Sequence, residues 1–253
     1  MVRGLDQFRE HFSEFGDQYI LIGGTACDLT MAEAGLAFRA THDLDIVLCV
    51  EVFNQEFAAS FWSFVKDGNY RQWETSTGKK KFYRFQNPTN EAYPKMLELF
   101  SRVPDALSIS DESRLTPIPT NSKISSLSAI LLDEDYYRWI RDGKIMLYGV
   151  PIVRAEHLIP LKVRAWLDLR QRKDAGEKID SRSIKKHKND VFRLAQIIDP
   201  EYEAEVPDAI SKDMERFLNA MVAVDSVDLK SIGVRSTSLE SLLNMLKNIY
   251  HLK

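Results

Sequence analysis

The stretch Arg39-Ala40-Thr41-His42-Asp43-Leu44-Asp45-Ile46-Val47-Leu48 decides both the fold and the candidate site. Alternate residues of a β-strand point to opposite faces, so the apolar residues at the even positions from 44 to 48 predict a buried face. Asp43 and Asp45 then point together to the other face, about 6.6–6.8 Å apart along the strand. The segment therefore predicts a strand that presents two neighbouring carboxylates.

Two interpretations of this carboxylate pair are open. Like charges on one sheet face repel each other and lower the tendency to form a strand. A divalent cation bound between them removes this penalty, and Mg²⁺ prefers carboxylate oxygens. The alternative is an exposed strand end with two solvated aspartates, and this motif alone does not decide between the two.

A second motif, Ile22-Gly23-Gly24-Thr25-Ala26, lies where an apolar run ends and a helix is expected, with Thr25 as a helix cap. Two glycines let the backbone approach a ligand closely because they lack a Cβ. The free N–H groups of a helix N-terminus favour an anion there. The GxxxxGK[ST] spacing is absent, so the motif is not a P-loop.

Glu98 interrupts the apolar strand Met96-Leu97-Glu98-Leu99-Phe100. Burial of a carboxylate is unfavourable unless the group is paired or bound to a metal. An edge-strand glutamate that faces water is one explanation. Beside Asp43 and Asp45, a third metal ligand on a neighbouring strand is the simpler one.

Lys162 lies within the apolar stripe of a helix predicted over 155–174. A lysine in that position must either extend its amine to solvent or meet an anion. Arg170 continues the basic character of this helix, whereas the run Lys185-Lys186-His187-Lys188 favours a surface face over a site.

The net charge of −3 favours no particular partner, but its distribution is uneven. Residues 154–193 hold 12 Lys and Arg against 6 Asp and Glu, a net charge of +6, which leaves −9 on the rest of the chain. A basic segment on an acidic protein suggests a phosphate-bearing ligand on one side. A solvated helix face is the plainer explanation of the same charges.

Other classes of site have little support. The five histidines are scattered and no GxSxG motif occurs, which argues against Ser–His or Cys–His catalysis and a His-rich metal site. His42 adjoins the carboxylates but is expected on the core face of its strand. Cys27 and Cys49 cannot form a disulfide framework, and no apolar run could span a bilayer. Acidic residues among the first 20 argue against a signal peptide, so we expect a reducing, cytoplasmic compartment and no membrane partner.

The pattern as a whole predicts an α/β half, about 1–152, and an all-helical half, about 153–253. Hydrophobic residues make up 44% and charged residues 28%, which excludes disordered and low-complexity classes. In the first half we expect helices over 5–15, 25–35 and 54–65, strands over 19–22, 43–50, 70–73, 81–85 and 95–100, a turn at Thr77-Gly78, an irregular stretch over 104–119 and half of a hairpin over 144–153. In the second half we expect helices over 155–174, 183–198, 207–224 and 238–251.

Together, Gly23-Gly24-Thr25, the pattern Arg39-x-Thr41-x-Asp43-Leu44-Asp45 and the later acidic strand resemble the DNA polymerase β-like nucleotidyltransferase superfamily. Within it the chain looks most like the AbiEii/AbiGii type, the nucleotidyltransferase toxins of abortive-infection and type IV toxin–antitoxin systems. The segment 156–165, followed by Arg170 and Lys173-Asp174, resembles the lysine-bearing helix of that family. The resemblance lies in scattered motifs over about 19–198. It implies an α+β fold, in which a nucleotidyltransferase-type mixed-sheet domain with flanking helices precedes a C-terminal helical bundle domain.

The resemblance also implies a set of site residues. Asp43, Asp45 and Glu98 would bind Mg²⁺ or Mn²⁺ and would form the catalytic set with Lys162. The substrate NTP would be held by a second set: Gly23, Gly24, Thr25, Arg39, Thr41, Lys162 and Arg170. The chain departs from the family in having Glu as its third carboxylate, and the position of a downstream aspartate stays open between Asp180 and Asp190.

The activity implied by the resemblance is Mg²⁺-dependent transfer of a nucleoside monophosphate from an NTP to an acceptor hydroxyl. RNA, and tRNA in particular, is the favoured acceptor, and a cognate antitoxin is an expected protein partner. Two alternatives remain: a non-catalytic nucleotide- or partner-binding protein of the same fold, and a nucleotidyltransferase that acts on a small molecule, as antibiotic-modifying enzymes do. A continuous basic groove beyond the cleft would favour RNA, and an acceptor pocket lined by aromatic residues would favour the small molecule.

Overall fold

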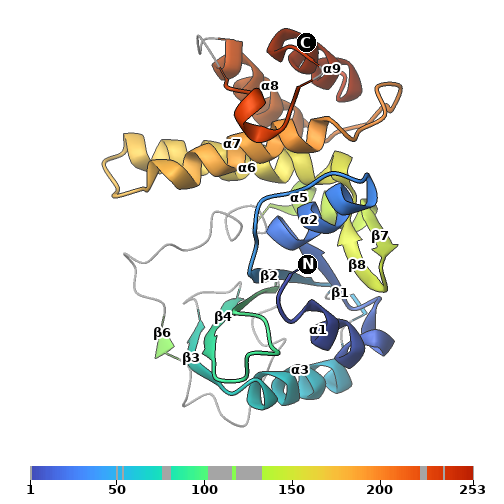
Figure 1. Ribbon diagram of the computed structural model, residues 1–253, viewed down its shortest axis with the longest axis vertical. Helices are drawn as coiled ribbons and strands as arrows, with labels where there is room; N and C mark the ends of the chain where they lie inside the picture. Colours follow the sequence, from blue (N-terminus) through green and yellow to red (C-terminus); the bar gives the residue numbers. More distant parts are fainter. Residues whose placement is uncertain are drawn as a thin grey trace.

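The computed structural model describes residues 2–49, 51–52, 54–75, 81–101, 116–117, 133–222, 227–235 and 237–252. Within these residues a mixed β-sheet carries helices on both faces, and further helices follow towards the C-terminus (Figure 1). The fold class is therefore α+β, as the sequence predicts. None of the helices in this described part is both long enough and apolar enough to cross a membrane.

The described strands form one eight-stranded sheet in the order β6-β3-β4-β5-β2-β1-β8-β7. Their bounds are β1 Tyr19–Ile22, β2 Asp43–Leu48, β3 Tyr70–Thr75, β4 Lys81–Pro88, β5 Met96–Ser101, β6 Thr116–Pro117, β7 Lys144–Leu147 and β8 Val150–Val153. The pairs β2–β5, β1–β8 and β3–β6 are parallel, and the other neighbouring pairs are antiparallel. β2 therefore lies inside the sheet, between β1 and β5.

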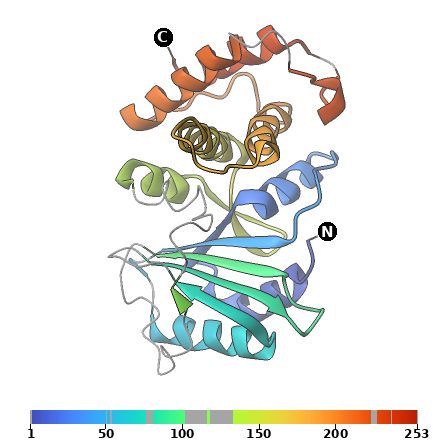
Figure 2. The ribbon, with the colours of Figure 1, turned by 90° about the vertical axis from the view of Figure 1, so that its left-hand side faces the viewer.

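The helices form layers on either side of this sheet. Their bounds are α1 Leu5–His11, α2 Gly23–Glu33, α3 Gln55–Asp67, α5 Glu134–Asp142, α6 Ala155–Asp174, α7 Ser181–Ala195, α8 Asp208–Val222 and α9 Leu239–Ile249, with short 3₁₀ turns at Ser13–Phe15 and Lys230–Ile232. Figure 2 shows α1 and α3 against one face and α2 against the other. The α6–α7 pair lies beyond α2, and α8 and α9 are outermost.

An aromatic cluster fixes α1 and α3 to the sheet. Asn54 caps the N-terminus of α3, because its Oδ1 accepts a hydrogen bond of 2.9 Å from the N–H of Phe57. The ring of Phe12 lies 4.5 Å from that of Phe8 and 5.4 Å from those of Phe57 and Phe64, between ring centroids. Aromatic pairs at such distances stabilise a core beyond their area burial alone, so this face is a structural core.

The register of β2 brings the sequence motifs together. Ile22 at the end of β1 pairs with Asp45, and Glu98 of β5 pairs with Asp45 from the other side. Every residue of β2 after Asp43 is buried, because helices cover both faces of the sheet. The start of α2, the two aspartates and Glu98 therefore meet at one place.

The observed elements differ from the predicted ones in a few ways. The 144–153 segment is a complete hairpin, β7–β8, and α5 was not predicted although its buried residues Tyr136, Tyr137 and Ile140 are helically spaced. β2 ends at Leu48, and α7 begins at Ser181 because Asp180 caps it by accepting from the N–H of Arg182. The predicted turn at Thr77-Gly78 and all of 104–119 except 116–117 lie outside the described residues.

Candidate functional site

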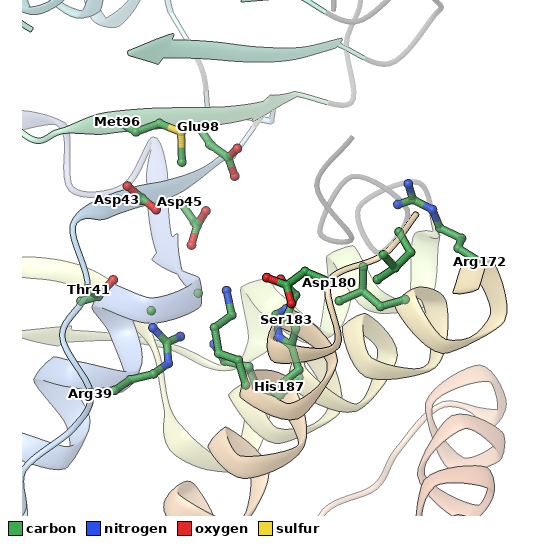
Figure 3. Close-up of a pocket in the computed structure, with 16 residues that line it drawn as sticks. Arg39, Thr41, Asp43, Asp45, Met96, Glu98, Arg172, Asp180, Ser183 and His187 are labelled. Carbon is green, nitrogen blue, oxygen red and sulfur yellow. The ribbon is translucent and has the colours of Figure 1, made fainter. Parts of the chain in front are cut away.

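A cavity of about 350 Å³ lies between the sheet and the α6–α7 pair (Figure 3). Its walls come from elements far apart in the sequence: the start of α2, the segment before β2, β2 itself, β5, α6 and α7. The lining residues are Gly23, Gly24, Arg39, Thr41, Asp43, Asp45, Met96, Glu98, Lys162, Leu169, Arg172, Ile179, Asp180, Ser183, Lys186 and His187.

The sheet side of the cavity is a wall of carboxylates. Asp45 is 9% exposed and Glu98 is 5% exposed, and they are register partners on adjacent parallel strands. Burial, the charge of Glu98 and a hydrogen bond with Glu98 raise the pKa of Asp45 well above its usual range. Burial also raises the pKa of Asp43. The arrangement therefore favours a proton or a cation between these carboxylates over two bare negative charges.

Glu98 has a cationic partner that the sequence did not identify. Arg84 lies directly across from Glu98 in the β4–β5 pair. Its Nε and Nη2 atoms lie 2.9 Å and 2.8 Å from Oε1 of Glu98, and the side chain of Arg84 is 11% exposed. Glu98 is thus held in position from the strand beyond it, on the side away from Asp45.

The glycines at the start of α2 are required by the carboxylates. Gly23 has φ of +67°, and a Cβ built there would lie 1.7 Å from Oδ2 of Asp45. A Cβ on Gly24 would lie 2.4 Å from Oγ1 of Thr41. Ile22 precedes the helix and supplies no side-chain cap, so the first N–H groups of α2 are available to a ligand beside the carboxylates.

Thr25 has a different role from the one expected. It lies inside α2 rather than capping it, it is fully buried, and it does not line the cavity. Its hydroxyl donates a hydrogen bond of 2.8 Å to the backbone carbonyl of Asp43. Thr25 therefore ties α2 to the first residue of β2 and positions Asp43 without facing the site.

The helical side of the cavity is cationic and is organised by Asp190. This carboxylate is fully buried on α7 and accepts from Nε and Nη2 of Arg39 at 3.1 Å and 2.9 Å. Nζ of Lys162 lies 3.3 Å and Nη1 of Arg193 lies 3.2 Å from its oxygens. Burial by itself would raise the pKa of Asp190, but the neighbouring Lys162 and Arg39 lower it to about 2. Three cations around one anion leave a net positive charge facing the carboxylate wall.

Lys162 meets an anion, so it does not extend to solvent. Its side chain is buried, and Nζ contacts Asp190 beside the thiol of Cys27. Burial opposes its charge, yet the nearby Cys27, Asp190 and Asp45 raise its pKa overall. Lys162 is therefore a charged group fixed between the two walls.

Lys186 and His187 also line the cavity, although the run 185–188 favoured a plain surface face. Lys186 makes no ion pair within the described part of the chain, and desolvation together with Arg39 and Lys162 lowers its pKa. Burial and the charges of Lys162 and Lys186 lower the pKa of His187 well below its usual range, so His187 is neutral at neutral pH. Successive residues of a helix point in different directions, so only part of the run 185–188 can face the cavity.

Two further expected positions differ from the structure. His42 precedes β2 and is exposed, so it does not lie on a core face. Arg170 lies outside the cavity, on the other side of α6, whereas Arg172 lines the cavity and pairs with Asp168 and Glu177. Of the two open aspartates, Asp190 is buried among the cations and Asp180 caps α7 at the edge of the cavity.

The donor set of the carboxylate wall fits Mg²⁺ or Mn²⁺ held by Asp43 and Asp45. These are hard oxygen ligands, and burial together with the charge of Glu98 raises the pKa of Asp45, so a bound cation would relieve an unfavourable negative charge. Among the described residues no group of three or more His, Cys, Asp or Glu side chains is spaced to enclose an ion. Mg²⁺ usually binds one or two carboxylates together with substrate phosphates, so a site of this kind is completed by its substrate.

A scan against protein-family models finds no match, and a sequence search of curated proteins finds none. Among solved structures the chain is similar to JHP933 from Helicobacter pylori, with a TM-score of 0.43 and 15% identity, over 96% of this chain and 87% of that one. It is also similar to the Megavirus polyadenylate synthase, with a TM-score of 0.40 and 10% identity, over 88% of this chain and 38% of that one.

Proposed function

We propose that this chain is a metal-dependent nucleotidyltransferase, which moves a nucleoside monophosphate from an NTP to an acceptor hydroxyl. The observation that carries the proposal is the division of one cavity into a carboxylate wall and a cationic wall. A triphosphate needs cations along its oxygens, and its metal ion needs carboxylates on the opposite side. The resemblance of the Gly23-Gly24 and Arg39-to-Asp45 motifs to nucleotidyltransferases supports the same reading.

Each group of residues has a defined task in this proposal. Gly23 and Gly24 allow phosphate oxygens to approach the free N–H groups of α2. Arg39, Lys162 and Lys186 neutralise the triphosphate and orient it for in-line attack. Mg²⁺ held by Asp43 and Asp45 would supply charge neutralisation on the phosphates and a lowered pKa for the acceptor hydroxyl.

Glu98 completes the carboxylate wall in this scheme. Because Arg84 binds one of its oxygens, the side chain of Glu98 is held in place beside Asp45, with which it shares a hydrogen bond. Arg84 and Thr25 are positioning residues, since Arg84 acts through the carboxylate of Glu98, Thr25 acts through the backbone carbonyl of Asp43, and neither lines the cavity. The acceptor that we favour is RNA, tRNA in particular, and the toxin role with a cognate antitoxin follows from the sequence resemblance alone.

A non-catalytic nucleotide-binding protein is the second candidate. It is favoured by the Arg84–Glu98 ion pair, which already neutralises the third carboxylate. Such a protein would bind an NTP between the two walls without transferring it. The two candidates therefore share a binding step and differ in the reaction.

The first test is incubation of the purified protein with each α-³²P-labelled NTP, Mg²⁺ or Mn²⁺, and total tRNA. We expect labelled RNA with the wild type and a loss of at least about 100-fold with Asp43→Asn/Asp45→Asn. The control is Asp142→Asn/Asp228→Asn, which makes the same charge change at two positions outside the cavity. Folding should be retained in both variants, because neutralising Asp45 relieves an unfavourable buried charge.

Isothermal titration with Mg²⁺ and NTP separates the remaining outcomes. Binding by wild type without label transfer to RNA would favour the non-catalytic candidate, or a protein or small-molecule acceptor. Wild-type activity in the Asp43→Asn/Asp45→Asn variant would refute the assignment of the carboxylates. Absence of both binding and transfer would refute the proposal as a whole.

A further inference from the structure

A second cavity, of about 410 Å³, opens between α6 and α7 on the side of Met221, near the end of α8. We call it the basic groove and define it by four cations: Arg170 and Lys173 on α6, and Lys185 and Lys188 on α7. α8 packs against α6 on the side away from the sheet (Figure 1). The basic groove and the candidate active site therefore lie on opposite sides of the same helix pair.

The four cations of the groove lack anionic partners. Within the part of the chain that the structure describes, none of them lies in an ion pair. Lys173 donates to Oγ of Ser181 at 2.8 Å, and the guanidinium of Arg170 lies 5.0 Å from the ring centroid of Trp166. Among the described residues that line the groove, Asp174 is the single carboxylate. The groove thus carries a local excess of positive charge on a protein whose net charge is −3.

The arginines of these helices that lie outside the groove are paired, whereas Lys186 in the candidate active site has no such partner among the described residues. Arg164, Arg172, Arg182 and Arg193 each have a carboxylate within 4.0 Å. The groove cations are therefore not explained by the ordinary pairing of charges along a helix. Desolvation and the neighbouring charge of Lys185 lower the pKa of Lys188, as expected for cations gathered without a counter-charge.

The spacing of the cations suits a chain of phosphates better than a single anion. Arg170 and Lys173 are three residues apart, as are Lys185 and Lys188, so each pair shares one face of its helix about 4.5 Å apart along the axis. Two such rows, one on each helix, flank the groove. One phosphate could contact only part of this set, whereas a polynucleotide backbone presents charges along its length.

The groove and the candidate active site lie next to each other near the turn between α6 and α7. The adjacent residues Arg172 and Lys173 line the active-site cavity and the groove respectively, and so do Ser183 and Ile184. The two cavities are thus separated by about one helix diameter, roughly 10 Å. A strand that lies in the groove can reach the active site around this turn.

We propose that the basic groove binds the phosphate backbone of an RNA strand. The idea that this RNA is the acceptor of nucleotide transfer rests on the proposed function. RNA binding by the groove does not itself require catalysis. It also accounts for part of the basic 154–193 segment, since Lys162, Arg172 and Lys186 line the active-site cavity and the four groove cations line the groove.

The test measures binding of fluorescein-labelled tRNA by anisotropy, without any NTP, over a series of salt concentrations. The groove variant is Arg170→Gln/Lys173→Gln/Lys185→Gln/Lys188→Gln. We expect its affinity to fall at least about 10-fold and the slope of log K against log salt to fall by up to about 3, since each contact contributes about 0.7–0.9. Circular dichroism melting checks that the variant folds.

Two controls distinguish the groove from a general loss of positive charge. Arg138→Gln/Lys212→Gln/Lys230→Gln/Arg235→Gln removes four cations elsewhere and should bind within about twofold of the wild type. Arg170→Lys/Lys173→Arg/Lys185→Arg/Lys188→Arg keeps the charges and should retain binding.

The proposal would be overturned by an absence of tRNA binding by the wild type, by equal weakening in the groove variant and the four-cation control, or by binding of anionic lipid vesicles in place of tRNA. RNA binding that depends on the groove, without label transfer in the NTP assay, would support the groove and refute RNA as the acceptor of nucleotide transfer. Transfer that is unaffected by the groove variant, with unchanged tRNA binding, would refute the groove alone.

Discussion

At the scale of single residues, the site is built from side chains that hold one another. Asp43 is tied to α2 through the hydroxyl of Thr25, and Glu98 is tied to β4 through Arg84. Asp190 binds Arg39 and Lys162 together. Such supports matter because a reacting group must be held to within a fraction of an ångström of its working position.

Gly23 provides the sharpest test at this scale. Gly23→Ala places a Cβ 1.7 Å from Oδ2 of Asp45 and imposes φ of +67° on alanine. We expect it to lower the free energy of unfolding by about 3 kcal/mol or more, because a steric clash is added to a backbone penalty of about 1–2 kcal/mol. Mg²⁺–NTP binding, measured by calorimetry, should weaken as Asp45 is displaced.

The matched control for this prediction is Gly35→Ala. Gly35 has φ of +72°, but no heavy atom lies within 4 Å of the position of its Cβ. Gly35→Ala should therefore lower the free energy of unfolding, measured in urea, by the backbone penalty alone, about 1–2 kcal/mol. Mg²⁺–NTP binding should be unchanged. Equal effects of the two substitutions would mean that Asp45 moves aside freely and that the contact with Gly23 has no role.

At the scale of elements, α6 contains a proline that another helix compensates. Pro160 lies inside α6 and cannot donate to the carbonyl of Glu156, four residues earlier. The hydroxyl of Tyr250, directly after α9, donates to that carbonyl at 2.6 Å, and Tyr250 is fully buried. The outermost helix is thereby joined to the helix that carries Lys162.

We expect Tyr250→Phe to lower the free energy of unfolding by about 1–3 kcal/mol, because the freed carbonyl loses its donor. In a Pro160→Ala background the same change should cost less, since an alanine at that position can supply the missing N–H. Tyr202→Phe is the control, at a tyrosine whose hydroxyl makes no hydrogen bond within the described residues. Urea unfolding of these variants measures the coupling, and strictly additive losses would contradict this account.

Most of the elements could be predicted because hydrophobic periodicity reports which residues face a core. The helix over 155–174 has the predicted bounds, and strand β2 begins at Asp43 as its alternation requires. Hydrophobic periodicity alone predicts neither the register between strands nor the rotation of one helix relative to another. For that reason the pairing of Arg84 with Glu98 was not foreseen, and Arg170 was expected in a cavity that it does not line.

The carboxylate motif and Lys162 were easier to find for a physical reason. A charged residue within an apolar run needs a partner, so its position alone signals a special environment. Arg84 lies in a strand of mixed polarity, and Asp190 lies in a helix rich in charge, where one more charged residue carries no such signal. Their roles follow from burial, which only the folded chain defines.

At the scale of the whole molecule, the two walls of the candidate active site belong to different parts of the chain. The carboxylates belong to the sheet, while Lys162, Lys186 and Asp190 belong to the helices that follow it. The Arg39–Asp190 ion pair joins these parts, since Arg39 lies in the segment that leads into β2. This ion pair therefore also helps to set the distance between the two walls of the cavity.

The pH dependence of folding reports on a contact between two helices, α5 and α6. His157 of α6 is buried and stacks on Trp139 of α5, with 3.9 Å between ring centroids. Burial, aided by the charge of Arg154, lowers its pKa from 6.5 to about 4. The native protein thus binds fewer protons than the unfolded chain between these pH values, and the stability present above pH 6.5 is lost as the pH falls towards 4.

We expect His157→Phe, which keeps an aromatic ring against Trp139, to reduce this pH dependence. Between about pH 7.5 and 4.5 the wild type should lose up to about 3 kcal/mol more of its free energy of unfolding than the variant does. Comparing the pH dependence of the two proteins removes the contribution of the carboxylates, because these titrate in both. His251→Gln, at an exposed position, controls for the loss of an imidazole. Equal pH dependence of the wild type and His157→Phe would show that His157 is protonated in the native state, and the stacked contact with Trp139 would then have to accommodate a charge.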